Sequence, residues 1–263
     1  MAFLPGTALI TPLLPLVNAG ITDMLTASFL QRRLPMPTLK RLLPLVLLVL
    51  LSGCSSEPVL SPITSRLPER VELSDVPFFP QNAFQSAPAA MASMLLHRGV
   101  NTDPGLLKDR VYIAGRDDMR PAMVATAEAH DMLVYPLQPT MDALLVEVAA
   151  GNPVLVLQNI GLDMWPEWHY AVVVGFDLHK QTLTLRSGGS RRLQSDFAAF
   201  EKTWKSSGRW AVLTLPASLV PASAQRPVWL KAAAELKEAG RDDAAQRAYR
   251  TAAERWPTQT TAQ

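Results

Sequence analysis

The helix and strand patterns of this chain are segregated, and this order is what most constrains the fold. A helix is expected from Ser86 to Arg98, with further helices at about 103–111, 119–130 and 140–150 and a short strand at 132–137. Four β-rich runs follow, "PVLVLQ", "WHYAVVVGFD", "QTLTLRS" and "RWAVLTLP", at 153–158, 168–177, 181–187 and 209–216. The short turn "LHK" predicts an antiparallel hairpin, and a helix is expected at about 195–206. Helices followed by a sheet are typical of an α+β fold rather than of alternating βαβ units.

Composition allows one complete domain core and argues against a basic nucleic-acid-binding surface. The chain has 263 residues, of which 48% are hydrophobic, which is enough for one domain with a small appendage. Its formal net charge is +2, but residues 1–53 hold four of the 25 Lys and Arg residues and one of the 23 Asp and Glu residues. The remainder is close to neutral, and we expect no nucleic-acid partner.

The first 53 residues have the pattern of a targeting signal and are left out of the fold. Lys40 and Arg41 precede the apolar run "LLPLVLLVLL", which leads into "LSGC" and Cys54. This run is short for a bilayer span and suits the core of a signal peptide. The segment resembles a bacterial lipoprotein signal with its lipobox. Residues 1–35 are expected to be an upstream extension, because Met36 would itself begin a signal peptide of ordinary length. The alternative is a membrane helix that is retained in the mature protein.

Cys54 is the only cysteine, and this limits the chemistry of the chain. An internal disulfide and a cysteine metal cluster are excluded, and no pair of histidines has metal-ligand spacing, so we expect no metal and no other cofactor. The thiol fits a lipid acceptor that anchors the protein to a membrane. Ser55 and Ser56 follow it, which in Gram-negative lipoproteins resembles sorting to the outer membrane, facing the periplasm. The Ser- and Pro-rich residues 54–70 are expected to form a tether.

The C-terminal segment, residues 226–259, resembles a single tetratricopeptide repeat in the spacing of its large, small and helix-ending residues. One such repeat cannot bury its own apolar face. We therefore expect Trp229, Leu236 and Tyr249 to face one another or the main domain, or the repeat to bind a protein partner. An amphipathic helical hairpin that closes the domain is the alternative.

Three stretches carry a resemblance to a known family: "VPFFPQNAFQSAPAAMASML", "WHYAVVVGFD" and "LRSGG". Together they resemble the bacteriocin-processing, double-glycine (C39-like) cysteine peptidases, which are papain-like, over roughly 71–216. More narrowly, the chain is similar to Gram-negative lipoproteins that join such a domain to tetratricopeptide repeats. The resemblance implies a papain-like fold over 71–218, with N-terminal helices packed on an antiparallel sheet.

The resemblance also implies the site residues. Gln81 takes the place of the oxyanion-hole donor and His169 that of the general base, while Ser86 stands where the nucleophilic Cys is expected. The family commonly has an Asp on the strand after the His. Here "LTLRSGGS" offers Ser187 but no acid, and Asp177 ends the strand of His169 near a turn, where we expect it to face solvent.

Each of these positions also has a structural interpretation. Ser86 could be the N-cap of the first helix, since Ser before "APAA" is favourable there. His169 could be a core histidine, and Gln81 and Gln85 could be hydrogen-bonding loop residues. A serine hydroxyl has no thiolate-like ground state and needs a base oriented by a third group.

The sequence therefore predicts a lipoprotein whose peptidase-like domain has lost its nucleophile and binds a peptide or protein segment in the former substrate groove. One alternative is an active peptidase, hydrolase or acyltransferase that uses Ser86 and His169, with Gln81 as oxyanion donor. The other is an assembly protein that acts through its helical repeat.

Overall fold

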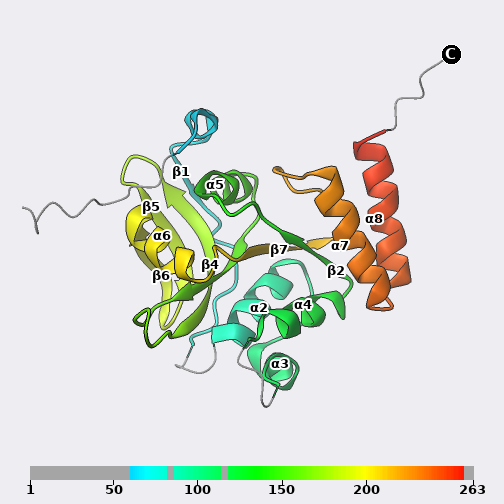
Figure 1. The fold of residues 1–263 in the computed structure, drawn as a ribbon, viewed down its shortest axis with the longest axis horizontal. Helices are drawn as coiled ribbons and strands as arrows, with labels where there is room; N and C mark the ends of the chain where they lie inside the picture. The colour runs from blue at the N-terminus through cyan, green and yellow to red at the C-terminus, as the bar shows by residue number, and fades with distance from the viewer. Residues whose placement is uncertain (1–59, 82–85, 114–117, 258–263) are drawn as a thin grey trace, which may run out of the picture. The chain divides into compact units, whose positions relative to one another are not determined.

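The computed structural model describes residues 60–81, 86–113 and 118–257, and these are built around one antiparallel sheet (Figure 1). The sheet has seven strands in the order β2-β7-β3-β4-β5-β6, with β1 paired to β4. The strands are β1 (Arg70–Glu72), β2 (Met132–Pro136), β3 (Val154–Asn159), β4 (Trp168–Asp177), β5 (Thr182–Ser187), β6 (Ser190–Asp196) and β7 (Ala211–Pro216).

Helices cover both faces of the sheet. One face carries α2 (Ser86–His97), α3 (Pro104–Val111) and α4 (Arg120–Glu128), and the other carries α5 (Met141–Ala149), α6 (Phe197–Ser206), α7 (Arg226–Glu238) and α8 (Asp242–Arg255) (Figure 1). A short 3-10 helix, η1 (Pro62–Arg66), precedes β1.

Strand alternation explains the two layers. In β3, Val154 and Val156 pack with α5 to α8, whereas Leu155 and Leu157 pack with α2 to α4. Successive side chains of a strand point to opposite faces, so an uninterrupted apolar run such as "VLVL" suits a strand covered on both sides.

The predicted fold class is confirmed: helices come first and pack on an antiparallel sheet, and a helical hairpin ends the chain. Strands β1 and β6 were not predicted. Strand β6 lies at the sheet edge and is mostly exposed, so it has no apolar alternation that could reveal it. Arg191 and Arg192 lie in this strand.

Strand β1 has little sequence signal of its own, and its pairing with β4 depends on a close approach of the two backbones at Gly175. It has only three residues and pairs with the end of β4, where Val71 lies opposite Phe176. A Cβ atom added at Gly175 would lie 2.5 Å from the Val71 carbonyl oxygen, so glycine is required for this pairing.

The segment expected as a tether over 54–70 is partly folded in the described residues. Leu60 and Leu67 pack against the core on the α5 side, and the Ser61 backbone N–H donates to the carboxylate of Asp142. The sequence pattern missed this because Ser- and Pro-rich segments show no period even when they are docked.

The C-terminal hairpin shares its core with the sheet. Trp229 and Leu236 are fully buried in the same cluster as Leu133 and Leu213, and Trp229 Nε1 donates to the Ala248 carbonyl at 2.8 Å. Tyr249, expected to face inward, is 38% exposed, so that expectation was wrong. The buried residues of α8 are instead its small alanines, Ala244, Ala245, Ala248 and Ala252.

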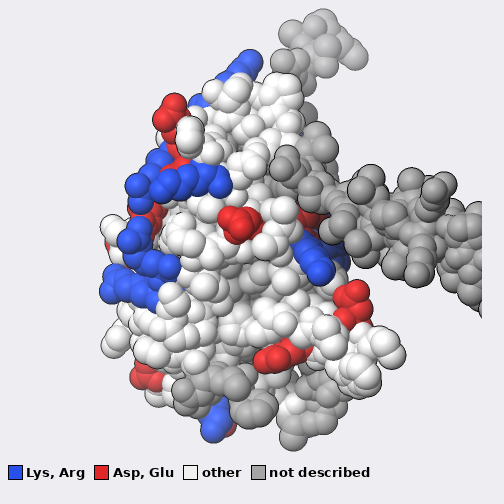
Figure 2. All heavy atoms as spheres, turned by 90° about the vertical axis from the view of Figure 1, so that its left-hand side faces the viewer, with Lys and Arg blue, Asp and Glu red and all other residues white. Residues whose placement is uncertain are grey.

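Charged side chains are unevenly spread on the face that carries α6 and β6. Figure 2 shows Lys and Arg gathered along one margin of this face, with Asp and Glu among them, and a largely uncharged middle. Within the described ranges, no helix has the length and hydropathy needed to cross a membrane.

Candidate functional site

Ser86 is the first residue of α2 and is 5% exposed. Its Oγ accepts a hydrogen bond of 3.3 Å from the backbone N–H of Tyr170 in β4. Among the described residues, no N–H of α2 donates to this oxygen, so its hydrogen bond differs from the one that the N-cap interpretation expects. The hydroxyl joins the helix start to the central strand, at the positive end of the helix dipole.

His169 lies one residue before that contact, near the beginning of β4. Its Nε2 is 2.9 Å from Ser187 Oγ at the end of β5. Burial lowers the pKa of His169, and the nearby Glu167 only partly opposes this. Within the part of the chain that the structure describes, no hydrogen bond joins His169 to Ser86.

Gln81 is held at both its backbone and its side chain by one glycine. The Gln81 N–H donates to the Gly188 carbonyl at 2.8 Å, and the Gly188 N–H donates to Gln81 Oε1 at 3.0 Å. The second bond fixes which end of the amide is oxygen, so the amide nitrogen points away from Gly188. Gln85, the other candidate glutamine, lies outside the described residues.

The end of β5 therefore brings Gln81, His169 and Ser187 together, whereas Ser86 is held by β4. Ser187 contacts His169, and the next residue, Gly188, holds Gln81. Asp177 does not take part, because its Oδ1 accepts from the Lys180 N–H in the turn after β4, as expected from its position.

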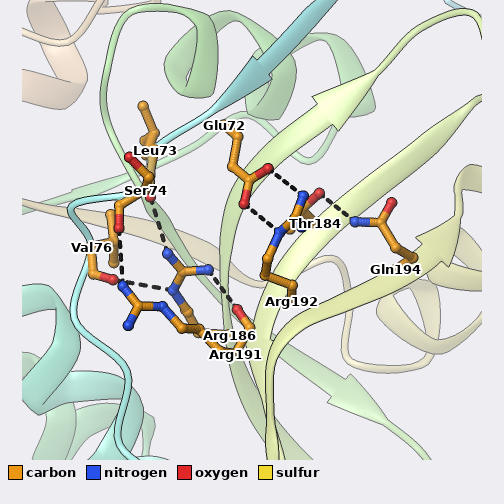
Figure 3. A network of polar contacts seen from close by, with 9 residues as sticks. All are labelled: Glu72, Leu73, Ser74, Val76, Thr184, Arg186, Arg191, Arg192 and Gln194. Atoms are coloured by element: carbon orange, nitrogen blue, oxygen red, sulfur yellow. Dashed lines mark hydrogen bonds and ion pairs between the residues drawn. The ribbon is translucent and has the colours of Figure 1, made fainter.

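Arg186, which immediately precedes these two residues, was not predicted as part of the site (Figure 3). Its side chain is 2% exposed; its Nε donates to the Val76 carbonyl at 3.1 Å and its Nη2 to the Leu73 carbonyl at 3.2 Å. A third bond reaches the Arg191 carbonyl on β6. These bonds hold the segment that leads to Gln81, and the sequence signal was a charged residue inside the apolar alternation of "LTLRS".

The neighbouring strand edge reinforces this arrangement (Figure 3). Arg191 donates to the Ser74 carbonyl, and Arg192 forms a bidentate pair with Glu72 at 2.6 and 2.7 Å. The pairing of β5 with β6 shifts register between Leu185 and Ser187, a bulge that sits beside the site.

A cavity of about 370 Å³ opens beside Ser86. Much of its wall is aromatic or aliphatic, and one ion pair, Asp118 with Arg120, lies in it. The Arg120 guanidinium holds the pKa of Asp118 below its usual value, while burial raises that of Tyr170. The lining residues are Ser86, Tyr112, Asp118, Met119, Arg120, Leu157, Trp168, Tyr170, Ser206 and Ser207.

Large apolar side chains are exposed in the loop between β3 and β4, which leads directly to the cavity wall. Met164 and Trp165 are 79% and 70% exposed, Leu162 is 66% exposed, and Trp168 both lines the cavity and is 45% exposed. Exposed apolar groups gathered next to a pocket are typical of a binding surface. The stretch "LDMWPEW" could have indicated this, because it places three large apolar residues in a loop.

Replacing Ser187 by Asp should raise the pKa of His169, because a carboxylate would then face the Nε2 of the ring and favour the imidazolium. An NMR titration of the His169 ring protons measures this. In the wild type the lowered pKa means that the folded state disfavours the proton. Stability is therefore present above the ordinary value of 6.5 and is lost as pH falls below it.

In Ser187→Asp this acid-induced loss should be smaller. Ser187→Ala is the matched control and should leave the pKa of His169 lowered. An unchanged titration in Ser187→Asp would show that residue 187 does not face the ring.

A family model described as the Peptidase_C39 like family matches residues 73–212, which include Gln81, Ser86, His169 and Ser187. No curated protein matches the chain.

Two solved structures are similar to it. One, described as a C39-like peptidase from Bacillus anthracis, is 18% identical with a TM-score of 0.47, over 56% of this chain and 98% of the other. The second is Xylellain, a cysteine protease from Xylella fastidiosa, at 12% identity and a TM-score of 0.43, over 60% of this chain and 94% of the other.

Proposed function

We propose that this chain, which belongs to the Peptidase_C39 like family, binds an extended peptide or protein segment beside Ser86 and does not cut it. One observation carries this: the Ser86 hydroxyl is bonded to the Tyr170 N–H, and in the described structure no hydrogen bond links it to His169.

Serine chemistry needs more than the right neighbours. A hydroxyl becomes a nucleophile only when a base accepts its proton, and that base must be oriented by a group that stabilises the imidazolium. The group at His169 Nε2 is the Ser187 hydroxyl, which is uncharged, and burial already disfavours the protonated ring. Both features argue for a weak or absent reaction at Ser86.

Binding, unlike catalysis, requires only a cavity and apolar surface, and the site has both. The cavity beside Ser86 is large enough for a bulky apolar side chain, and Leu157, Met119 and Tyr170 offer it apolar contact. The exposed Trp165 and Met164 extend this surface beyond the cavity mouth. We therefore propose a segment with a large apolar residue as the ligand.

A library of random decapeptides displayed on phage tests the proposal. Selected peptides should share one aromatic or large aliphatic residue, and mass spectrometry should find synthetic copies intact after long incubation with the protein. Met119→Trp, which narrows the cavity, should weaken binding about tenfold or more, as loss of a filled apolar pocket does.

Leu193→Trp is the control, because Leu193 is 42% exposed on β6 and does not line the cavity. Unfolding midpoints of both variants would exclude a general loss of structure. Cleavage of the peptides, or labelling of Ser86 by a fluorophosphonate, would replace the binding function with a hydrolase.

We also propose that the protein is a lipoprotein anchored through Cys54, although Cys54 lies outside the described residues. The support is the signal pattern that ends in "LSGC" and the absence of any other cysteine in the sequence. Metabolic labelling with a fatty-acid probe should mark the wild type and miss Cys54→Ala. Equal labelling of both proteins would remove the assignment.

A further inference from the structure

A second hollow of about 590 Å³, which we call the acidic groove, lies between α4 and the last turns of α7. It is contiguous with the cavity beside Ser86, because Asp118 and Arg120 line both. Tyr170 of the cavity also touches Trp210 of the groove edge-on, with ring centres 5.9 Å apart. The groove is lined by Asp118, Arg120, Pro121, Val124, Ala125, Glu128, Trp210, Glu235, Glu238 and Ala239.

Glu128 gives the groove its chemical character. It is 8% exposed, and among the described residues it forms no hydrogen bond and no ion pair, although its carboxylate oxygens are not fully closed off from solvent. A largely buried carboxylate without a partner is less stable than a solvated one, and a cation that reaches it from the groove would stabilise it. Burial and the nearby Glu235 and Glu238 raise the pKa of Glu128, as expected where negative groups crowd together.

The positive charges at hand do not balance this cluster. Arg120 is held by both carboxylate oxygens of Asp118 at 2.8 Å. Lys231 reaches Glu235 at 3.5 Å, but its side chain is 77% exposed, so the pair is a weak surface contact. Glu128 and Glu238 have no basic partner among the described residues.

The shape of the groove favours an organic cation over a metal ion. In the described part of the chain, no three His, Cys, Asp or Glu side chains are close enough together to hold a metal. The groove instead combines the carboxylates with Val124, Ala125 and the ring of Trp210. An aliphatic stem with a charged end matches this mixture, since Lys and Arg bury their stems on apolar surface and stack on aromatic rings.

We propose that the acidic groove binds a Lys or Arg side chain of the same segment that places an apolar side chain in the cavity beside Ser86. This inference rests on the proposed function. It gives the C-terminal hairpin a direct part in recognition, because Glu235 and Glu238 belong to α7.

The spacing between the two side chains follows from α4. Arg120 begins this helix beside the cavity and Glu128 ends it in the groove. Eight helical steps span about 12 Å, and an extended chain covers that distance in about four residues. The basic residue should therefore lie about four positions from the apolar one.

Two probes separate the groove from the cavity. The first is Nα-acetyl-arginine amide, observed by NMR at the indole N–H of Trp210, with Nα-acetyl-norleucine amide as the uncharged control. The second is a set of acetylated decapeptides with one fixed Phe, one Lys moved through the other positions, and Ser or Gly elsewhere.

We expect arginine amide to shift the Trp210 signal and norleucine amide to leave it unchanged. Among the peptides, Lys about four residues from Phe should bind best, and Lys→norleucine at that position should weaken binding about tenfold, the scale of a close charge pair. Glu128→Gln should abolish both charge effects and keep the dependence on Phe. The control Glu254→Gln, an exposed acid on α8, should change neither.

Binding that depends on Phe but not on Lys would overturn the inference and leave the proposed function standing. Arginine amide binding that requires Glu128, without any binding that depends on Phe, would support the cation site and remove the proposed function. Absence of both responses would overturn the two together.

Discussion

Ser86→Cys is expected to produce an activated thiol that iodoacetamide alkylates about tenfold faster at pH 7 than a free cysteine, which is only a few per cent thiolate there. The start of α2 favours the thiolate at this position, and His169, next to the Tyr170 whose N–H bonds Ser86, would add to this effect when protonated. The measurement belongs in a Cys54→Ser background, so that the introduced thiol is the only one in the protein.

His169→Ala in the same background should lower this rate and leave only the enhancement that the helix start provides. Adding Ser187→Asp should raise the rate further, because a carboxylate at Nε2 would stabilise the imidazolium that pairs with the thiolate. An ordinary alkylation rate in Ser86→Cys would show that neither the helix start nor His169 stabilises a thiolate at position 86. The groove would then be a binding surface with no remnant of the catalytic arrangement.

Ser86→Ala separates structure from chemistry at the same position. It removes the acceptor of the Tyr170 N–H and should cost about 1 kcal/mol of stability, as loss of one hydrogen bond does. A similar unfolding midpoint for Ser86→Cys and Ser86→Ala would show that the reactivity of the introduced thiol does not arise from a disturbed fold.

Trp229→Ala is expected to lower the free energy of unfolding by about 3–5 kcal/mol, the cost of deleting a fully buried tryptophan. For a domain of this size that corresponds to a fall in Tm of about 10 °C. The reason is that α7 shares the apolar cluster of the sheet and that the Trp229 indole also donates to Ala248 on α8. Calorimetry or a thermal scan by circular dichroism measures it.

Tyr249→Ala is the matched control on the facing helix and should change Tm little, because Tyr249 is 38% exposed. A single cooperative transition that shifts as a whole in Trp229→Ala would show that the hairpin and the sheet unfold together. A second, separate transition in that variant would instead mark α7 and α8 as an independent module and would contradict this prediction.

Joint unfolding of the hairpin and the sheet, tested by Trp229→Ala, would have a consequence for the acidic groove. If the hairpin unfolds with the domain, Glu235 and Glu238 are held against α4 in the native state rather than on a loosely attached repeat. The hairpin would then extend the proposed binding surface of the domain, and the expected helical repeat would form part of the expected substrate groove.

Local sequence patterns determined much of this protein. The apolar period of "AAMASMLL" predicted α2, and β-rich runs such as "PVLVLQ" predicted strands. The hairpin turn after Asp177 was also predicted, since these features depend on residues a few positions apart. The resemblance that placed Gln81, Ser86 and His169 in one site used the same local motifs.

Only the tertiary structure decided how distant residues meet. Arg186 holds carbonyl groups 110 and 113 positions away, Gly188 holds Gln81 from 107 positions away, and Tyr170 holds Ser86 from 84 positions away. Such contacts depend on strand register, on the bulge beside Ser187 and on the face that each helix covers, none of which a local period encodes. For the same reason the sequence shows Glu128 and Glu238 only as acids near the ends of two separate helices. The packing of α4 and α7 around the edge of the sheet places them in the wall of one groove.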